Sequence, residues 1–285
     1  IEKSYKSMKD KISKLSLIPV ITGFIGKAEK GEITTLGRGG SDYTASIFGA
    51  AAGAEEIQIW TDVDGVMSAD PKIVPGAQTI EKISFDEASE LAYFGARVLH
   101  PKTLLPAINK NIPVKVLNTF NPQHQGTTIT KKSKHDDQVI KAIACKKNIT
   151  LINIKSSRML GAYGFLARIF SIFAKYGKSV DAIATSEVAI SLTIDDNEDV
   201  DKIVDELNEI SSTTLATNKA LICVVGDRME YEPGIAGRIF STLGKEAINI
   251  EMISQGASQI NLTFIVDGKD AEKSVNILHN EFFGE

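Results

Sequence analysis

The sequence is poor in the features that would commit it to a disulfide scaffold, a membrane or a nucleic acid. Its 285 residues include two cysteines, Cys145 and Cys223, and both lie in apolar runs, which predicts buried, reduced thiols. It has no apolar run of the ~18 residues that a bilayer requires and no recognisable secretory signal. The net charge of −4 provides no basic field for nucleic acid or acidic lipid. We therefore expect a soluble, cytoplasmic protein of two or three domains with no nucleic-acid or membrane partner.

The first part of the chain alternates between strand-like and helix-like segments. The apolar run Leu17–Ile21 predicts a buried strand, and Ile57–Trp60 and Pro113–Val116 predict two further strands. Ser41 is positioned to cap a helix over residues 42–52. Ser84 and Glu87 have the spacing of a capping box and open a second helix that reaches Ala96. This alternation predicts a mostly parallel sheet with helices on its faces.

The strongest organisational signal is an internal repeat between residues 164–193 and 234–263, at a constant offset of 70. The matched pairs include Gly164 with Gly234, Arg168–Ser171 with Arg238–Ser241, Lys175 with Lys245, and Leu192–Thr193 with Leu262–Thr263. In each copy a glycine opens an amphipathic helix, whose apolar face in the first copy contains Phe165, Leu166, Ile169, Phe170 and Phe173. Two strands and a second helix follow, so each copy is a βαββα unit that needs one more strand. This is the ferredoxin-like plan.

The two copies differ in where their last strand can come from. Residues 213–216 can complete the first copy, but no strand is left for the second, which runs to Glu285. We infer that the strand-like segment 139–144 supplies it. The predicted domains are residues 1–130, then 148–217 for the first repeat unit, and 138–147 together with 218–285 for the second. The first unit is thus inserted within the second, and the polar stretch 127–137 is expected to be a solvated linker.

A glycine-rich turn, Gly37-Arg38-Gly39-Gly40-Ser41-Asp42, stands between a strand region and a helix start. Adjacent glycines let backbone N–H groups approach an anion, and a helix N-terminus adds favourable partial charge. Arg38 offers a planar fork that suits a carboxylate or phosphate, and Asp42 could orient cationic groups or a metal. Such a turn is also common without any function, so the segment alone leaves both interpretations open.

A second polar segment, Thr61-Asp62-Val63-Asp64-Gly65-Val66, directly follows a predicted strand, where open α/β sheets bind ligands. It lacks the third acidic ligand and the distal Glu of a calcium loop, so no metal site is predicted there. Lys72 and Arg97 add cations further along the chain. The four histidines show no pairing, and a packed or surface role is preferred for each: His100, His124, His135 and His279.

These segments resemble aspartokinase, a branch of the amino-acid kinases, in their order and spacing. The matching segments are Leu36–Ala45, Thr61–Val66, Ala69–Pro71, Phe94–Pro101, Asn118–Phe120 and Gly126–Thr127. The run Gly-Arg-Gly-Gly-Ser-Asp is specific to this branch, and the resemblance extends over essentially the whole chain. It implies an α/β fold, in which the C-terminal, nucleotide-side lobe of an amino-acid-kinase domain with a mostly parallel sheet precedes two ferredoxin-like βαββαβ ACT domains.

The resemblance implies transfer of the γ-phosphoryl group of ATP, bound with Mg²⁺, to the side-chain carboxylate of L-aspartate. The product is 4-phospho-L-aspartate, the first step toward lysine, threonine and methionine. By position, Arg38, Gly39, Gly40 and Ser41 would bind aspartate, with Ser41 and Asp42 at the reacting end. The nucleotide positions would be Thr61, Asp62, Met67, Lys72, Arg97 and Val98. Asp42 would organise cations and need not act as a base, because a carboxylate nucleophile is already ionised.

The sequence departs from the family pattern at three points. Met67 stands where a tyrosine is expected, and Lys72 replaces an arginine. The lysine-containing Lys-Phe-Gly-Gly-type strand and loop that opens the family's kinase domain has no counterpart before Leu17. We therefore expect the chain as given to be inactive by itself.

The repeat half resembles the lysine-binding first ACT domain of lysine-inhibited aspartokinases. The implied effector positions are Met159, Ala162, Gly164, Phe165, Leu166, Ser179, Val180, Asp181, Ser186 and Glu187. Asp181 and Glu187 can pair with ammonium groups, while backbone N–H groups at the helix start near Gly164 can take the carboxylate. In the second copy Gly256–Ala257 replaces Ser186–Glu187, which favours packing and dimerisation over effector binding.

The resemblance thus implies L-lysine as the inhibitor and a homodimer, or dimer of dimers, built through the ACT domains. The sequence leaves two other hypotheses about function open. The chain could be a non-catalytic, amino-acid-sensing regulatory chain, although such a chain would have no reason to keep the glycine turn and the Thr-Asp-Val-Asp-Gly segment. It could also be another kinase of the same fold, against which the tandem ACT pair argues.

Overall fold

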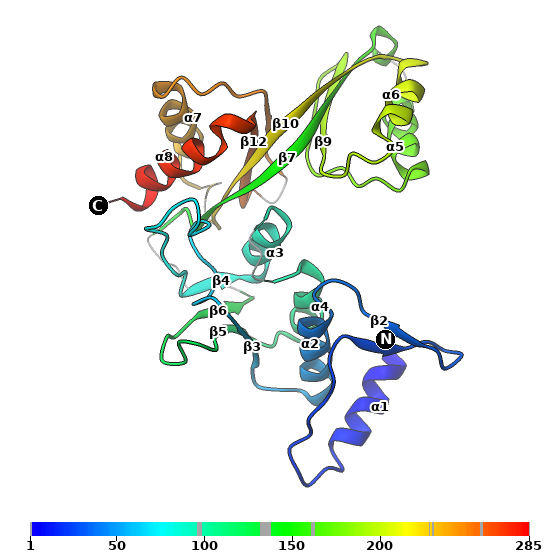
Figure 1. The fold of residues 1–285 in the computed structure, drawn as a ribbon, viewed down its shortest axis with the longest axis vertical. Helices are drawn as coiled ribbons and strands as arrows, with labels where there is room; N and C mark the ends of the chain where they lie inside the picture. Colours follow the sequence, from blue (N-terminus) through cyan, green and yellow to red (C-terminus); the bar gives the residue numbers. More distant parts are fainter. Residues whose placement is uncertain are drawn as a thin grey trace. The chain divides into compact units, whose positions relative to one another are not determined.

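The computed structural model describes residues 2–95, 99–131, 138–160, 163–227, 229, 231–256 and 259–284. The chain divides into two compact units. The first consists of Ile1–Ala144 with Val225–Pro233, and the second consists of Cys145–Val224 with Gly234–Glu285. Within the described residues, no helix combines the length and apolar character needed to cross a bilayer. The ribbon can be followed by colour and label in Figure 1.

The first unit is built around a four-stranded sheet in the order β3-β5-β6-β4. Its strands are β3 (Ile57–Thr61), β4 (Lys82–Ser84), β5 (Val114–Asn118) and β6 (Thr127–Thr130). The pairs β3–β5 and β4–β6 are parallel, whereas β5–β6 is antiparallel. A separate antiparallel hairpin consists of β1 (Ile25–Lys27) and β2 (Ile33–Thr35). The expected alternation and the mostly parallel pairing of the sheet are both present.

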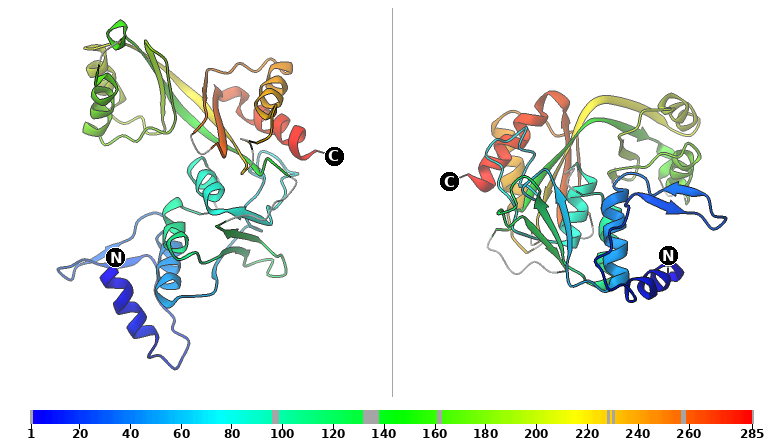
Figure 2. Two further views of the ribbon diagram at one scale, coloured as in Figure 1. Left: turned by 180° about the vertical axis from the view of Figure 1, so that it is seen from behind. Right: turned by 60° about the horizontal axis from the view of Figure 1, so that its bottom comes forward.

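The described residues of this unit form the helices α1 (Glu2–Ile12), α2 (Gly40–Ala52), α3 (Phe85–Tyr93) and α4 (Pro101–Lys110). The predicted capping box is confirmed, because Ser84 accepts a hydrogen bond from the amide of Glu87 while the Glu87 carboxylate accepts one from the amide of Ser84. α2 and α4 pack side by side, as both views of the unit show (Figures 1 and 2). This packing brings the start of α4 next to the glycine turn that opens α2.

The second unit contains a six-stranded sheet in the order β11-β12-β10-β7-β9-β8. Its two central strands are long, β7 (Ala142–Lys155) and β10 (Ser212–Val225), with 14 residues each. The outer strands are β8 (Ile183–Thr185), β9 (Ala189–Ile194), β11 (Met252–Ser254) and β12 (Asn261–Asp267). β9 pairs antiparallel with both β7 and β8, and β11 pairs antiparallel with β12. The two central strands run along each other in Figure 1 and join the two halves of the sheet.

Each half of this sheet carries its own helices. The first half has the 3-10 turn η1 (Ser157–Met159), α5 (Phe165–Lys175) and α6 (Val200–Asn208). The second half has α7 (Ile235–Lys245), the 3-10 turn η2 (Gly268–Asp270) and α8 (Ala271–Phe283). One hydrophobic core joins β7, β9, α5 and α6, and its most buried members include Ile152, Ile169, Phe173, Leu192 and Ile203. The architecture is the ferredoxin-like one expected of ACT domains.

Several local predictions are wrong, each for an identifiable physical reason. Leu17–Ile21 is neither a strand nor buried, since Ile18 is 93% and Val20 99% exposed and no strand pairs with this run. Apolar composition alone does not supply the backbone partners that an inner strand requires. Ser41 does not cap α2, because Gly39 occupies the N-cap in the left-handed region (φ 70°) and the helix begins two residues earlier than expected.

The predicted linker and helix face also need correction. Thr127–Thr130 is strand β6, with Thr127 fully buried, so the expected linker is not a linker at its start, and its residues 132–137 lie outside the described residues. Its threonines are β-branched and fit a pleated, half-buried position better than a loop. On α5 only part of the expected apolar face is buried, and Leu166 and Phe170 stay 43% and 38% exposed. The side chain of Cys223 is buried as expected, whereas that of Cys145 is partly exposed.

Candidate functional site

The glycine turn folds into an open helix N-terminus. Gly37 and Gly39 both have positive φ, 78° and 70°, which favours glycine, and the Gly40 amide donates to the carbonyl of Gly37 at 3.0 Å. Among the described residues no side chain caps the start of α2. Because the first amides of a helix have no partner within the helix, those of Ser41 and Asp42 are available to an anion.

Gly39 and Gly40 are packed so tightly that neither can be replaced unless a neighbouring group moves. A Cβ on Gly39 would lie 2.7 Å from the Cβ of His100, at the start of α4. A Cβ on Gly40 would lie 2.9 Å from a ring carbon of Phe24. Thr44 on α2 holds the same neighbour, since its hydroxyl accepts from the Phe24 amide at 3.0 Å and donates to the Gly40 carbonyl at 2.7 Å. The turn is therefore fixed from two sides while the amides of Ser41 and Asp42 remain open.

The predicted aspartate-side residues have different exposures at this turn. Arg38 and Ser41 are exposed, whereas Asp42, in the first turn of α2, is half-buried. Burial raises the pKa of the Asp42 carboxyl, because its charged form loses solvent. A cation brought close to this carboxylate would relieve that cost. Asp42 is therefore suited to orienting a cation near the open helix terminus.

The Thr61–Asp62 segment lies at the carboxyl end of β3, beside the end of the parallel strand β5. The amide of Thr119 donates to the carbonyl of Thr61 at 2.8 Å, and the Thr61 hydroxyl donates to the Asp62 carboxylate at 3.1 Å. Asp64 accepts from the side-chain amides of Asn118 and Asn121 at 2.8 and 3.1 Å. The loop is thus held from the β5 end, at the edge where parallel sheets bind ligands.

The other predicted nucleotide residues follow the same loop. Met67 is half-buried, forms an isolated bridge with Thr79, and accepts a hydrogen bond from the Thr79 hydroxyl at 3.5 Å. Lys72 is exposed in a turn in which its amide donates to the Asp70 carboxylate at 2.9 Å. Arg97 and Val98 lie outside the described residues.

A buried threonine completes the support of this loop, and sequence reasoning did not assign it a role. The Thr127 hydroxyl accepts from the Val66 amide at 2.8 Å and donates to the carbonyl of Ile80 at 2.6 Å. A Cβ on Gly65 (φ 127°) would come within 2.5 Å of that hydroxyl oxygen. Asn118, Asn121 and Thr127 were not predicted as positioning residues, because the contacts that reveal their role join segments about 50 to 60 positions apart.

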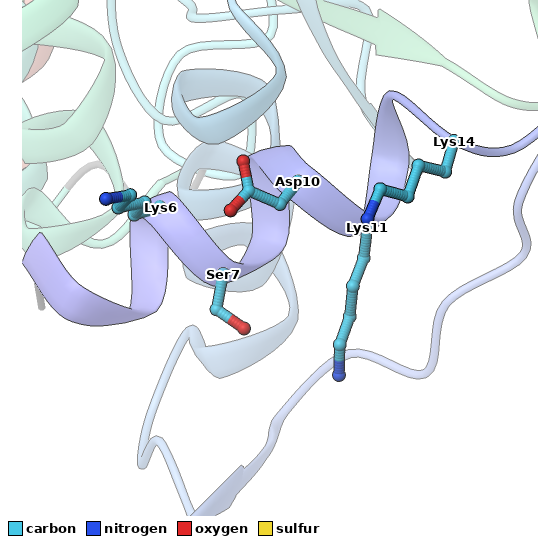
Figure 3. A pocket seen from close by; sticks show the side chains of 5 residues that line it. All are labelled: Lys6, Ser7, Asp10, Lys11 and Lys14. Atoms are coloured by element: carbon cyan, nitrogen blue, oxygen red, sulfur yellow. The ribbon is translucent and has the colours of Figure 1, made fainter.

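A surface hollow elsewhere in this unit contains none of the predicted site residues. It lies on α1 and is lined by Lys6, Ser7, Asp10, Lys11 and Lys14 (Figure 3). In the figure Lys6, Ser7, Asp10 and Lys11 project from α1, Lys14 lies just beyond the end of the helix, and the side chains do not converge. We therefore do not assign a ligand to this hollow.

The predicted effector residues come from three neighbouring stretches of the second unit. Gly164 is the N-cap of α5 (φ 76°) with no side-chain cap among the described residues, so the amides of the first helical turn are open. Met159 and Val180 are partly buried against the core of this half, Phe165 is buried, and Leu166 is 43% exposed. Ala162 lies outside the described residues.

The polar effector residues divide into an open and a closed group. Ser179, Ser186 and Glu187 are exposed, and Ser186 closes a turn by donating its amide to the carbonyl of Ala189 at 2.8 Å. The Asp181 side chain is only 3% exposed, and its carboxylate already pairs with the ammonium of Lys146 at 3.0 Å. Lys146 lies on β7, more than 30 positions away in sequence, and was not predicted.

The comparisons with known proteins match this architecture. Residues 2–118 match the amino acid kinase family, and residues 152–209 and 222–282 match the ACT domain. Aspartokinase 3, chloroplastic, of Arabidopsis thaliana is 45% identical over 297 residues, 99% of this chain and 53% of that protein. The chain thus spans about half the length of this curated relative.

Solved structures give the same answer. The structure of E. coli aspartokinase III in complex with aspartate and ADP (R-state) matches with a TM-score of 0.81 and 41% identity, over 92% of this chain and 60% of that one. The same enzyme in complex with lysine and aspartate (T-state) matches with a TM-score of 0.77 and 42% identity, over 92% and 59%.

Fold and site together define an amino acid kinase region joined to ACT domains. Within that class, the similarity to proteins named aspartokinase extends over nearly the whole chain. The chain thus combines an amino acid kinase region with ACT domains, as the aspartokinases that it resembles do.

Proposed function

We propose that the protein containing this chain is an aspartate kinase, which transfers the γ-phosphoryl group of ATP to the side-chain carboxylate of L-aspartate. The observation that carries the proposal is the glycine turn, where the exposed Arg38 and the half-buried Asp42 flank uncapped amides of α2. A similar structure, 41% identical, holds aspartate and ADP. The family likeness of the glycine turn and the Thr61–Asp62 loop supports the same reaction.

The proposed roles follow from the chemistry of each group. Arg38 clamps a carboxylate of aspartate with its guanidinium fork, Gly39 and Gly40 shape the turn against which aspartate lies, and the open amide of Ser41 stabilises developing negative charge. Asp42 orients Mg²⁺ that arrives with ATP, and Ser41 lies at the reacting end. Mg²⁺ commonly binds through one or two carboxylates together with substrate phosphates, so the few acidic groups at this turn are adequate for it. These residues position the reactants and do not need to move a proton.

We assign the nucleotide to the Thr61–Asp62 loop and the residues that follow it. Thr61, Asp62, Met67 and Lys72 would contact it, together with Arg97 and Val98. Support comes from the fixed geometry of the Thr61–Asp62 loop, which Thr119 and the Asp64 network hold at the end of two parallel strands. Phosphoryl transfer depends on positioning and electrostatics, so a rigid loop suits the reaction.

The direct test is formation of an acyl phosphate by the intact protein, trapped as the hydroxamate. Arg38→Lys keeps the charge but loses the bidentate fork, and we expect kcat/KM for aspartate to fall about 10- to 100-fold with little change in the KM for ATP. Asp42→Asn should lower kcat. Arg168→Lys, an exposed exchange on α5, serves as the matched control. If wild-type protein with ATP, Mg²⁺ and aspartate forms no hydroxamate, the proposed activity is wrong.

We further propose feedback inhibition by L-lysine bound at the start of α5 and the adjoining loops. Open amides near Gly164 can hold the α-carboxylate, and the exposed Glu187 can accept an ammonium group. A structurally similar aspartokinase contains lysine together with aspartate. Calorimetric titration of the intact protein with lysine should give saturable binding that Glu187→Ala abolishes, and absence of binding to wild-type protein would refute this assignment.

We also propose the domain division 1–130, 148–217, and 138–147 with 218–285, in which the first ACT domain is inserted in the second. The strand order supports it, because β7 and β10 are neighbours at the centre of the sheet. β9 and β8 follow on the side of β7, and β12 and β11 follow on the side of β10. Assembly as a homodimer or dimer of dimers through the ACT domains is supported by exposed apolar side chains at Leu160, Tyr163 and Leu166. Light scattering on the intact protein tests it. We also propose a cytoplasmic location, which is consistent with Cys145 and Cys223 not being joined in a disulfide.

A further inference from the structure

The carboxylate of Asp181 is closed off by an internal cation. Its side chain is 3% exposed, and its Oδ2 atom accepts a hydrogen bond from the Lys146 ammonium at 3.0 Å. The same ammonium lies 2.7 Å from a carboxylate oxygen of Asp195, just after β9, whose side chain is 47% exposed. Lys146 itself is 20% exposed. One lysine therefore links a buried acid of the proposed effector site to a partly exposed acid outside it.

The loop that carries Asp181 is held firmly by its backbone. The amide of Asp181 donates to the carbonyl of Thr193 at 2.9 Å, and the amide of Ala182 donates to the Thr193 hydroxyl at 3.0 Å. Thr193 is fully buried on β9. The position of Asp181 therefore does not depend on its ion pair alone.

The lysines nearest to Lys146 and Asp181 in the sequence pair with other acids. Lys178, in the same loop, pairs at 2.7 Å with Asp196, and its side chain is 5% exposed. Lys147, next to Lys146 on β7, pairs instead with Glu272 on α8 at 2.6 Å. Burial lowers the pKa of Lys146, but its hydrogen bonds to Asp195 and Asp181 outweigh burial and leave the pKa raised. Lys146 thus remains charged at neutral pH.

The second copy of the repeat has a comparable arrangement from a different position. Glu251 occupies the position equivalent to Asp181, and the Lys219 ammonium lies 2.7 Å from its carboxylate and 3.1 Å from that of Asp267. Lys219 is on β10, whereas Lys146 is on β7, and the two lysines are not equivalent at the repeat offset of 70. In both copies an internal lysine neutralises the acid that leads into the second strand of the unit.

We propose that the ammonium group of Lys146 competes with an ammonium group of the effector for the Asp181 carboxylate. When free L-lysine binds, its ammonium group takes the place of Lys146 at Asp181. This inference rests on the proposed lysine binding and deepens it. Lys146 can give up Asp181 without becoming isolated, because it keeps Asp195 as a partner in the partly exposed position. Exchange of one ammonium for another also leaves the buried Asp181 carboxylate neutralised throughout, which avoids the large cost of an unpaired buried charge. The exposed Glu187 requires no such exchange.

Exchange predicts that two substitutions change lysine affinity in opposite directions. Lys146→Gln removes the competing charge, so the dissociation constant for lysine should fall about three- to tenfold. Asp195→Asn removes the alternative partner of Lys146 and strengthens its hold on Asp181, so the dissociation constant should rise about threefold. Lys147→Gln, which removes the adjacent charge and its exposed ion pair, should leave affinity unchanged.

The experiment is calorimetric titration of the intact protein and these three variants with L-lysine, with thermal denaturation of each alongside. If Lys146 has only a structural role, the Lys146→Gln variant should have a lower melting temperature. It should bind L-lysine as well as or more weakly than wild type, but not more tightly. Tighter binding by Lys146→Gln with weaker binding by Asp195→Asn supports exchange. Unchanged or weaker binding by a folded Lys146→Gln protein overturns exchange while the lysine site stands. Absence of binding in every protein overturns both the lysine site and the exchange.

Discussion

Replacement of Gly39 by alanine tests whether the glycine turn must keep its shape for catalysis. The residue has φ 70°, and an L-residue in the left-handed region costs about 1–2 kcal/mol. The added Cβ would also lie 2.7 Å from the Cβ of His100 and 3.4 Å from its Cγ, so the turn or the start of α4 must shift. Overpacking of this kind costs about 1–3 kcal/mol. We expect a total loss of roughly 2–5 kcal/mol in unfolding free energy.

The chain offers two matched controls for this substitution. Gly37 has φ 78° and Gly53 has φ 66°, and a Cβ at either would meet nothing within 4 Å. Gly37→Ala and Gly53→Ala should therefore cost only about 1–2 kcal/mol each, from backbone strain alone. Because Gly53 terminates α2 at its other end, that variant should also keep its activity.

The assay combines urea denaturation with acyl-phosphate formation by the intact protein. A shift of the turn of about 1 Å should lower kcat/KM by about 100-fold in Gly39→Ala. If Gly39→Ala is as stable and as active as Gly53→Ala, the close contact with His100 does not position the turn, and the reasoning fails.

Three further changes probe other parts of the structure. Asn118→Ala removes the amide that donates to Asp64 and should raise the KM for ATP with a loss of about 1–3 kcal/mol in stability; an unchanged KM would remove Asn118 from the support of the nucleotide loop. Thr127→Val loses two buried hydrogen bonds and should lower the melting temperature clearly more than Thr128→Val, and equal effects would contradict this. Burial lowers the pKa of His279 below 6.5, so its neutral form is favoured in the folded state. The neutral His279 side chain stabilises the fold above about pH 6.5, and this contribution is lost as the pH falls below that value. Wild-type protein should therefore lose more stability than the His279→Gln variant between pH 7.5 and 5.5.

The sequence predicted most reliably those features that depend on near neighbours in the chain. The capping box of Ser84 and Glu87 needs only three residues of spacing, and it is present. The strand at Ile57 has alternating burial that follows its apolar pattern. The repeat was detectable because the same helix and strands recur at a constant offset, and both copies form comparable elements.

Features that depend on distant partners could not be predicted in this way. Leu17–Ile21 has the composition of a buried strand but no strand beside it. Thr127 has the polarity of a linker residue, yet its hydroxyl is buried between Val66 and Ile80. The pairing of Lys146 with Asp181 joins residues 35 positions apart and depends on where β7 lies in the sheet. Such contacts determine which polar groups are open to a ligand. The exposure of a site residue can therefore be known only from the folded structure.

We propose that one protein phosphorylates aspartate and responds to lysine through the unit that contains α5. The most direct test is the initial rate of 4-phospho-L-aspartate formation by the intact protein, measured at increasing lysine concentration in wild type and in Glu187→Ala. We expect the rate to fall as the lysine concentration rises in wild type and to stay constant in the variant. A wild-type protein that does not phosphorylate aspartate, or whose rate does not depend on lysine, would contradict it.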